Sequence, residues 1–170
     1  MSEPRTIIRD WWGRQIGLRE SSAARALAAR LNRGDAVAVL SERAVFELGR
    51  TLGLLTQPER LVPLVQVLAA VREDRGGPLP RRLGQGEPPL LSPLRFERLL
   101  RAENADLATQ IRRALPMVER ACDVGALGAD MLYWTDSTRA AWAFRYHGAN
   151  PPAPPGATDT PAESGEETNA

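Results

Sequence analysis

The spacing of the apolar residues most constrains the fold, because it follows the period of an α-helix through most of the chain. In one stretch, Leu107, Ile111, Leu115 and Val118 recur every three or four residues. No segment shows the period-two alternation of a half-buried β-strand, and no internal repeat of roughly 20 to 50 residues is present. The sequence therefore predicts an all-α fold built as one compact body.

Residues typical of helix ends divide the N-terminal part of the chain into separate predicted helices. We expect helices over 5–16 and 21–33, followed by a short apolar link and a helix capped by Ser41. Thr56 and Glu59 have the spacing of a capping box, which predicts the start of another helix. Together these segments form a predicted N-terminal helical unit.

A stretch dense in glycine and proline, Arg72 to Leu91, is the predicted linker or functional loop. Beyond it, Ser92 begins a helix and Asp136 caps the last one. We therefore expect an N-terminal helical unit over residues 1–75 and a C-terminal helical unit over residues 76–148, packed together.

Charge is distributed unevenly along the chain. Residues 1–148 contain 22 Arg against 17 Asp and Glu, a net of +5, whereas residues 149–170 contain four acids and no Arg, a net of −4. Residues 149–170 are also rich in proline and poor in apolar side chains, so they cannot bury enough surface to offset the entropy of ordering. We expect a basic helical body followed by a disordered acidic tail (residues 149–170).

The residue inventory argues against several functions. Cys122 is the single cysteine and His147 the single histidine, so neither a disulfide nor a zinc ligand set can form. Nucleophiles and proton-transfer residues form no recognisable set, and the Gly84-Gln85-Gly86 turn lacks the Lys-Ser/Thr of a phosphate-binding loop. We expect a protein without enzyme activity or cofactor. The absence of a signal peptide and of an apolar run of ~20 residues predicts a cytoplasmic protein.

The stretch Ser92 to Leu115 combines helical spacing with an excess of arginine. Between Arg95 and Arg113 there are five Arg and three acids. One interpretation is that these arginines face water or pair with acids three or four residues away. The other is that several guanidinium groups gather on one surface and bind phosphate in bidentate geometry.

Five segments, taken in order, resemble a known family. They are RDWWGRQ, AARALAARLNRG, LPRRLG, LSPLRFERLLRAENADLATQIRRAL and ADMLYWTDSTRAAWAFRYH. In this order, over residues 7–147, the chain resembles the CasB small subunit of the type I-E CRISPR Cascade complex. The resemblance implies an all-helical, non-enzymatic subunit, present in two copies, of a crRNA-guided complex that acts in antiviral defence.

The resemblance also implies partners and a role. The partners would be crRNA and target DNA, the backbone and large subunits of Cascade, and a second copy of the chain. In such complexes base pairing with the guide reads the target sequence, while protein subunits hold backbones by charge and shape. The subunit is expected to bind a target or displaced DNA strand, or crRNA, without sequence specificity and to stabilise the R-loop.

Matching positions in the quoted segments assign the predicted nucleic-acid contacts to arginines. Arg33, which ends the second predicted helix, is a looser match, and Arg98 and Arg14 are added from local charge alone. The other predicted contacts are Arg81, Arg95, Arg101, Arg112, Arg113 and Arg139.

The four tryptophans have two possible roles. Trp11 and Trp134 are predicted core residues, whereas Trp12 and Trp142 stay open as contacts with other subunits.

Two other classes of protein stay open as alternatives. A helical protein–protein adaptor would carry the arginines as ordinary solvent-facing charges and would have no affinity for nucleic acid. A helix-turn-helix regulator would need an exposed recognition helix after a tight turn, and the sequence shows no convincing one.

Overall fold

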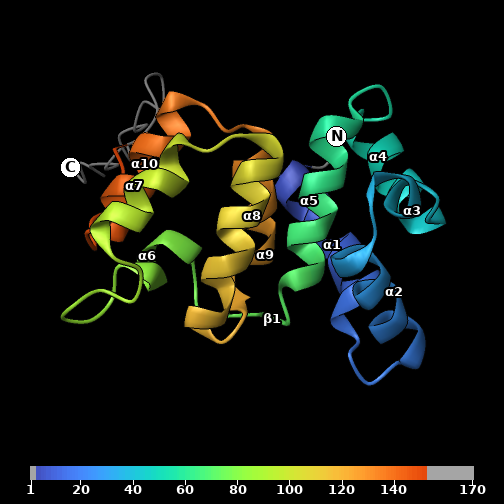
Figure 1. Ribbon diagram of the computed structural model, residues 1–170, viewed down its shortest axis with the longest axis horizontal. Helices are drawn as coiled ribbons and strands as arrows, with labels where there is room; N and C mark the ends of the chain where they lie inside the picture. The colour runs from blue at the N-terminus through green and yellow to red at the C-terminus, as the bar shows by residue number, and fades with distance from the viewer. Residues whose placement is uncertain (1–2, 153–170) are drawn as a thin grey trace, which may run out of the picture.

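The computed structural model describes residues 3–152, and in this range the chain is built almost entirely from helices, as predicted. Figure 1 shows the N-terminal helices on one side of the molecule and the C-terminal helices on the other, with α5 and α8 in the middle. The N-terminal elements are α1 (Pro4–Trp12), a π-helical turn (Gly13–Gly17), α2 (Ser22–Arg33), α3 (Ala36–Leu40), α4 (Arg43–Leu52) and α5 (Pro58–Ala70).

The second half begins with a two-residue strand and ends with the long helix α10. Its elements are β1 (Glu73–Asp74), α6 (Leu79–Leu83), α7 (Pro93–Arg101), α8 (Asn104–Ala114), a 3-10 turn (Leu115–Val118), β2 (Ala121–Cys122), α9 (Val124–Leu132) and α10 (Asp136–Tyr146). The first two residues of the predicted acidic tail lie against this half, and the tail from residue 153 onward lies outside the described residues.

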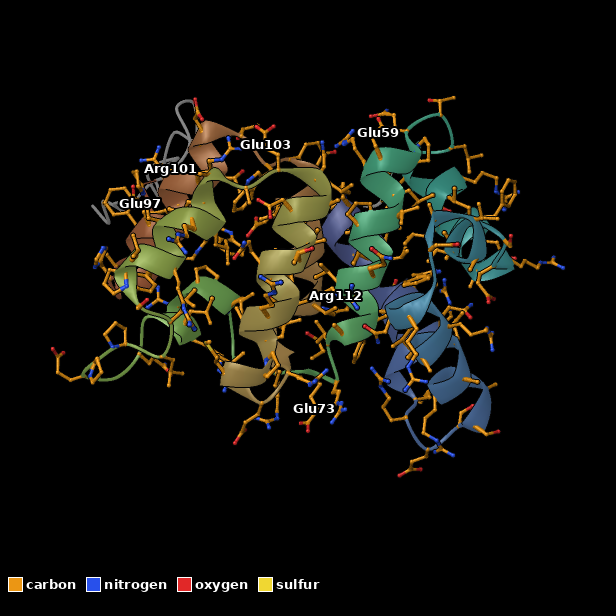
Figure 2. All side chains as sticks on the ribbon, viewed as in Figure 1. Glu59, Glu73, Glu97, Arg101, Glu103 and Arg112 are labelled. Atoms are coloured by element: carbon orange, nitrogen blue, oxygen red, sulfur yellow. The ribbon has the colours of Figure 1, made fainter. Side chains whose placement is uncertain are left out.

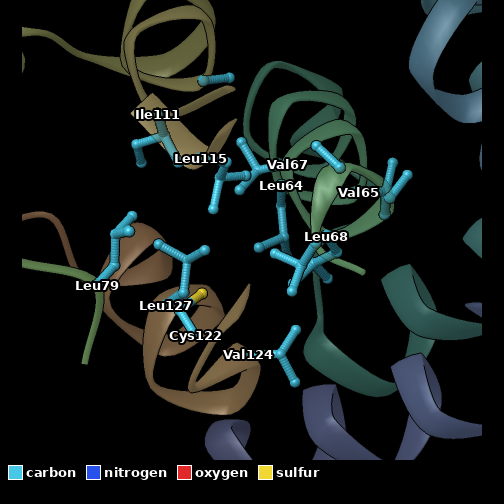
Figure 3. Close-up of a cluster of buried hydrophobic side chains, with 14 of the residues drawn as sticks. Leu64, Val65, Val67, Leu68, Leu79, Ile111, Leu115, Cys122, Val124 and Leu127 are labelled. Atoms are coloured by element: carbon cyan, nitrogen blue, oxygen red, sulfur yellow. The ribbon is translucent and has the colours of Figure 1, made fainter. Parts of the chain in front are cut away.

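The two halves share one hydrophobic core. α1 packs mainly against α9, and α5 packs against α8, so the main helix contacts cross the predicted boundary at residue 75. The division into units 1–75 and 76–148 therefore stays a prediction. Figure 3 shows side chains from α5, α8 and α9 meeting in one cluster, with Leu68 and Leu127 among them. Because α5 lies at the centre, every residue from Leu61 to Ala70 except Gln66 is buried.

The all-α prediction is confirmed, and the structure adds one short strand pair that the sequence did not indicate. β1 and β2 form a parallel pair in which Glu73 aligns with Ala121 and Asp74 with Cys122. Two residues are too few to show a period of two, so no sequence pattern could predict this pairing. The pair joins the end of α5 to the start of α9, and Asp74 Oδ1 accepts a hydrogen bond from Val124 N at 2.9 Å.

Several helix starts in the first half differ from the prediction. The predicted apolar link after Asp35 is the short helix α3, because the Asp35 carboxylate accepts the Ala38 N–H at 2.9 Å and caps it. Ser41 does not cap α4, since its hydroxyl donates back to the Val37 carbonyl of α3. The predicted capping box of Thr56 and Glu59 is also absent, because α5 begins after Gln57 without a side-chain cap.

The first predicted helix, 5–16, is helical throughout, but it changes from α to π geometry at Gly13. The start of the last helix was mispredicted. The residue that caps α10 is Thr135, whose hydroxyl accepts the Thr138 N–H, and not the predicted Asp136.

Gly84 permits the close contact between α6 and α10. A Cβ atom at this position would lie 1.8 Å from the Tyr146 carbonyl oxygen and 2.7 Å from its carbon, both backbone atoms. We expect Gly84→Ala to lower the free energy of unfolding by about 1–3 kcal/mol, because the helices must move apart. Urea unfolding measures this loss.

Gly13→Ala is a matched control for that substitution. Gly13 has helical backbone angles, and a Cβ atom there would meet nothing within 4 Å. Its expected effect is an increase of roughly 0.5–1 kcal/mol, from the lower backbone entropy of the unfolded chain. If both variants changed stability alike, the proposed clash at Gly84 would be wrong.

Candidate nucleic-acid interface

A groove between α7 and α8 brings together three of the predicted arginines. Arg95 and Arg98 of α7 face Arg113 of α8, and Gln110 adds an amide beside Arg113. We call this site the α7–α8 groove; its other lining residues are Leu91, Leu99, Ala114 and Met117.

Local helix geometry explains why these side chains meet. The Ser92 hydroxyl accepts the Arg95 N–H and caps the start of α7. Phe96 and Leu99 are the buried residues of α7, so Arg95 and Arg98, three residues apart, project from the rim of its buried face. On α8, Arg113 likewise projects from the rim of the buried face, because its neighbours Ile111 and Ala114 face the core.

The three groove arginines carry positive charge that no nearby acid neutralises. Within residues 3–152, Arg95, Arg98 and Arg113 form no ion pair and no side-chain hydrogen bond, and all three are exposed. Two of the three acids in this stretch are engaged elsewhere, since Glu97 pairs with Arg101 and Glu103 with Arg139. The groove can therefore offer several guanidinium forks to one anionic chain.

Arg101 lies on the same helix but not in the groove. Its Nη2 is 2.7 Å from Glu97 Oε1, one turn away on α7, and Figure 2 shows the two side chains together. Both groups are exposed, so the pair contributes little to stability and leaves Arg101 accessible.

Arg112 points away from the groove, toward the other half of the molecule. Its Nη2 donates to the Asn32 carbonyl at 2.6 Å, and Figure 2 shows Arg112 between α8 and α5. Arg33, the next residue after Asn32, is exposed at the end of α2. Adjacent arginines on α8 thus serve two surfaces, since Arg113 faces the groove and Arg112 binds the carboxyl end of α2.

Arg139 has a predominantly structural environment. It is half-buried and joins α10 to the end of α7 through the Leu100 carbonyl, 2.8 Å from its Nε, and to the link before α8 through Glu103, 3.2 Å from its Nη2. Its guanidinium also lies over the ring of Trp134 at 5.5 Å. These partners leave few of its donors for another ligand.

Arg81 is likewise occupied. Its Nη2 donates to Asn150 Oδ1 at 2.8 Å and to the Ala149 carbonyl at 3.3 Å. Arg81 therefore holds the start of the acidic tail against α6.

The tryptophans lie in the protein's own core. Trp11 is buried, as predicted, and Trp134 packs against the core. Trp12 and Trp142, considered as contacts with other subunits, are buried as well; Trp12 Nε1 donates to the Leu68 carbonyl and Trp142 Nε1 to Asp130 Oδ2. Both side chains therefore pack inside the fold of this chain. The sequence left their role open because amphipathic periodicity does not distinguish a core face from an interface.

Sequence reasoning missed a second arginine cluster at the end of α5. Arg72 and Arg120 are brought together by the strand pair, since the Arg72 N–H donates to the Arg120 carbonyl at 2.8 Å. Arg19 joins them, donating from Nη2 to the Ala69 and Val71 carbonyls. Burial and then the charges of Arg72 and Arg120 lower the pKa of Arg19. No local signal predicts this cluster, because its members come from three distant parts of the chain.

The remaining features give no sign of a metal site or a membrane segment. Residues 3–152 contain no group of three or more His, Cys, Asp or Glu side chains positioned to hold a metal ion. In the same range, no helix combines the length and the hydropathy that crossing a membrane requires.

Comparison with known proteins identifies one match. A family model described as CRISPR-associated protein Cse2 matches residues 19–147. The match runs from before α2 to the end of α10 and includes eight of the nine arginines considered above as predicted contacts, from Arg33 to Arg139; Arg14 lies before it. No curated protein and no solved structure matches the chain significantly.

Proposed function

Because the chain belongs to the CRISPR-associated Cse2 family, and is thus a non-catalytic small subunit of the type I-E Cascade complex, we propose that it holds a nucleic-acid backbone in the α7–α8 groove. The family confirms the resemblance found in the sequence. The observation that carries the proposal is the convergence of Arg95, Arg98 and Arg113 without acidic partners in the described chain.

The groove chemistry favours phosphate over bases. Guanidinium groups match phosphate oxygens in bidentate geometry, and such contacts carry no sequence information. The described residues that line the groove include no aromatic ring on which a base would stack. The protein would then hold a target or displaced DNA strand, or crRNA, by charge and stabilise the R-loop whatever its sequence.

The test is the affinity of the full chain for unrelated single-stranded DNA, duplex DNA and RNA over a salt series. We expect similar affinities for different sequences of one type and a steep fall with salt, at about 0.7 to 0.9 per phosphate contact in log–log slope. A strong preference for one duplex site would favour a regulator instead. The absence of binding at low salt would favour the protein–protein adaptor.

A further inference from the structure

The acidic tail leaves the protein body close to the α7–α8 groove. Arg81 holds residues 149 and 150, and the Ala149 N–H donates to the Phe144 carbonyl of α10 at 2.9 Å. α10 in turn adjoins α7, because the rings of Tyr146 and Phe96 stack with centroids 4.0 Å apart. Figure 1 shows α7 and α10 side by side at one end of the molecule.

One hydrogen bond ties this exit point to the groove itself. The Tyr146 hydroxyl donates to the carbonyl of Leu91, and Leu91 lines the α7–α8 groove. The tail therefore begins about the width of one helix, α7, away from the three arginines.

The tail is long enough to cross that helix. Asp159, its first acid, lies nine residues beyond Asn150, and an extended chain spans about 3.3 Å per residue, or roughly 30 Å in total. A helix with its side chains is only about 10–12 Å across. The other three acids, Glu163, Glu166 and Glu167, lie farther along and reach at least as far.

Charge complementarity selects the groove as the surface for the tail. The tail carries four acids and no arginine, while the groove presents three arginines that form no ion pair with the described residues. Arg81, which lies nearest the tail, already binds Asn150 and neighbouring carbonyls. A tethered segment has an effective concentration in the millimolar range, so a charge interaction with a millimolar dissociation constant fills the groove about half of the time.

We propose that the acidic tail folds back into the α7–α8 groove of its own chain and is displaced by nucleic-acid phosphates. The competition rests on the proposed function, whereas the tail's occupation of the groove does not. The tail would weaken binding to stray nucleic acid and yield to a strand presented at high local concentration within the assembled complex.

Occupation is tested without nucleic acid, by a spin label on the tail of the full chain. Ser164→Cys introduces a labelling site between the acids, while Cys122 does not react because burial raises the pKa of its thiol to about 12. At low salt we expect the label to broaden the side-chain NMR signals of Arg95, Arg98 and Arg113 more than those of Arg43 and Arg50 on α4. Salt should reverse the broadening.

A charge-neutral tail is the matched control. Changing Asp159→Asn, Glu163→Gln, Glu166→Gln and Glu167→Gln keeps the length of the tail and should abolish the selective broadening. Absent or uniform broadening in the acidic chain, or broadening unchanged in the neutral one, would overturn the proposed occupation whether or not the protein binds DNA.

The competition has its own readout. The neutral-tail chain should bind single-stranded DNA about two- to tenfold more tightly than the natural chain at low salt. With Arg95, Arg98 and Arg113 replaced, neutralising the tail should give a smaller gain. An equal gain in both backgrounds would show that the tail acts by general repulsion, and the proposal would be wrong.

Discussion

Replacing Arg95, Arg98 and Arg113 with glutamine should weaken binding to single-stranded DNA by about 10- to 100-fold near ~0.1 M salt and make the salt dependence shallower. Each lost contact with a single strand removes about 0.7 from the log–log slope, so three contacts remove roughly 2. The residual affinity would come from other arginines, including the cluster of Arg19, Arg72 and Arg120. The measurement is fluorescence anisotropy over a salt series.

A control variant must remove the same charge from another surface. Arg25, Arg43 and Arg50 are exposed, are not among the predicted contacts and belong to the N-terminal side of the molecule, so changing all three to glutamine lowers the net charge equally. We expect this variant to lose much less affinity than the groove variant. Equal losses in the two variants would mean that only net charge matters, and the α7–α8 groove would not be a binding site.

Replacing Trp142 with alanine is expected to lower the free energy of unfolding by about 3–5 kcal/mol, as measured by urea denaturation. The side chain is 0% exposed, so its removal leaves a cavity between α10 and its neighbours. The substitution also removes the hydrogen bond from Trp142 Nε1 to Asp130 Oδ2, which measures 2.7 Å.

The stability that is lost with that hydrogen bond should depend on pH. Burial raises the pKa of Asp130, and the Trp142 hydrogen bond opposes this effect by stabilising the ionised carboxylate. A raised folded-state pKa means that ionisation of Asp130 destabilises the fold as pH rises through that pKa. Without Trp142 the ionised Asp130 carboxylate loses a hydrogen-bond donor. The free energy of unfolding lost in Trp142→Ala should therefore be larger at neutral pH than at acidic pH, where the carboxyl is protonated.

Phe144 provides the comparison on the same helix. It lies two residues from Trp142 and is 46% exposed, so Phe144→Ala should change stability by far less than Trp142→Ala. A Trp142→Ala variant as stable as the natural chain would contradict the burial of this residue and restore it as a candidate contact with another subunit.

The helical class and the family could be predicted because their signals are local. Apolar residues at helical spacing show which segments are helices, and the order of segments such as RFERLLRA and IRRAL matches a known pattern. Helix starts were less predictable. Asp35, Ser41 and Thr135 all have side chains that can cap, and which of them does so depends on contacts with neighbouring elements.

The sequence by itself determined that this protein is helical, belongs to a Cascade small-subunit family and carries excess arginine on its body with acids on its tail. Only the tertiary structure decided which arginines can bind a ligand. The physical reason is that the competing partners are distant in sequence: Arg112 binds a carbonyl 80 residues away, and Arg139 one 39 residues away. Arg95, Arg98 and Arg113 meet no such partner within residues 3–152, and that difference follows from packing and not from their local sequence.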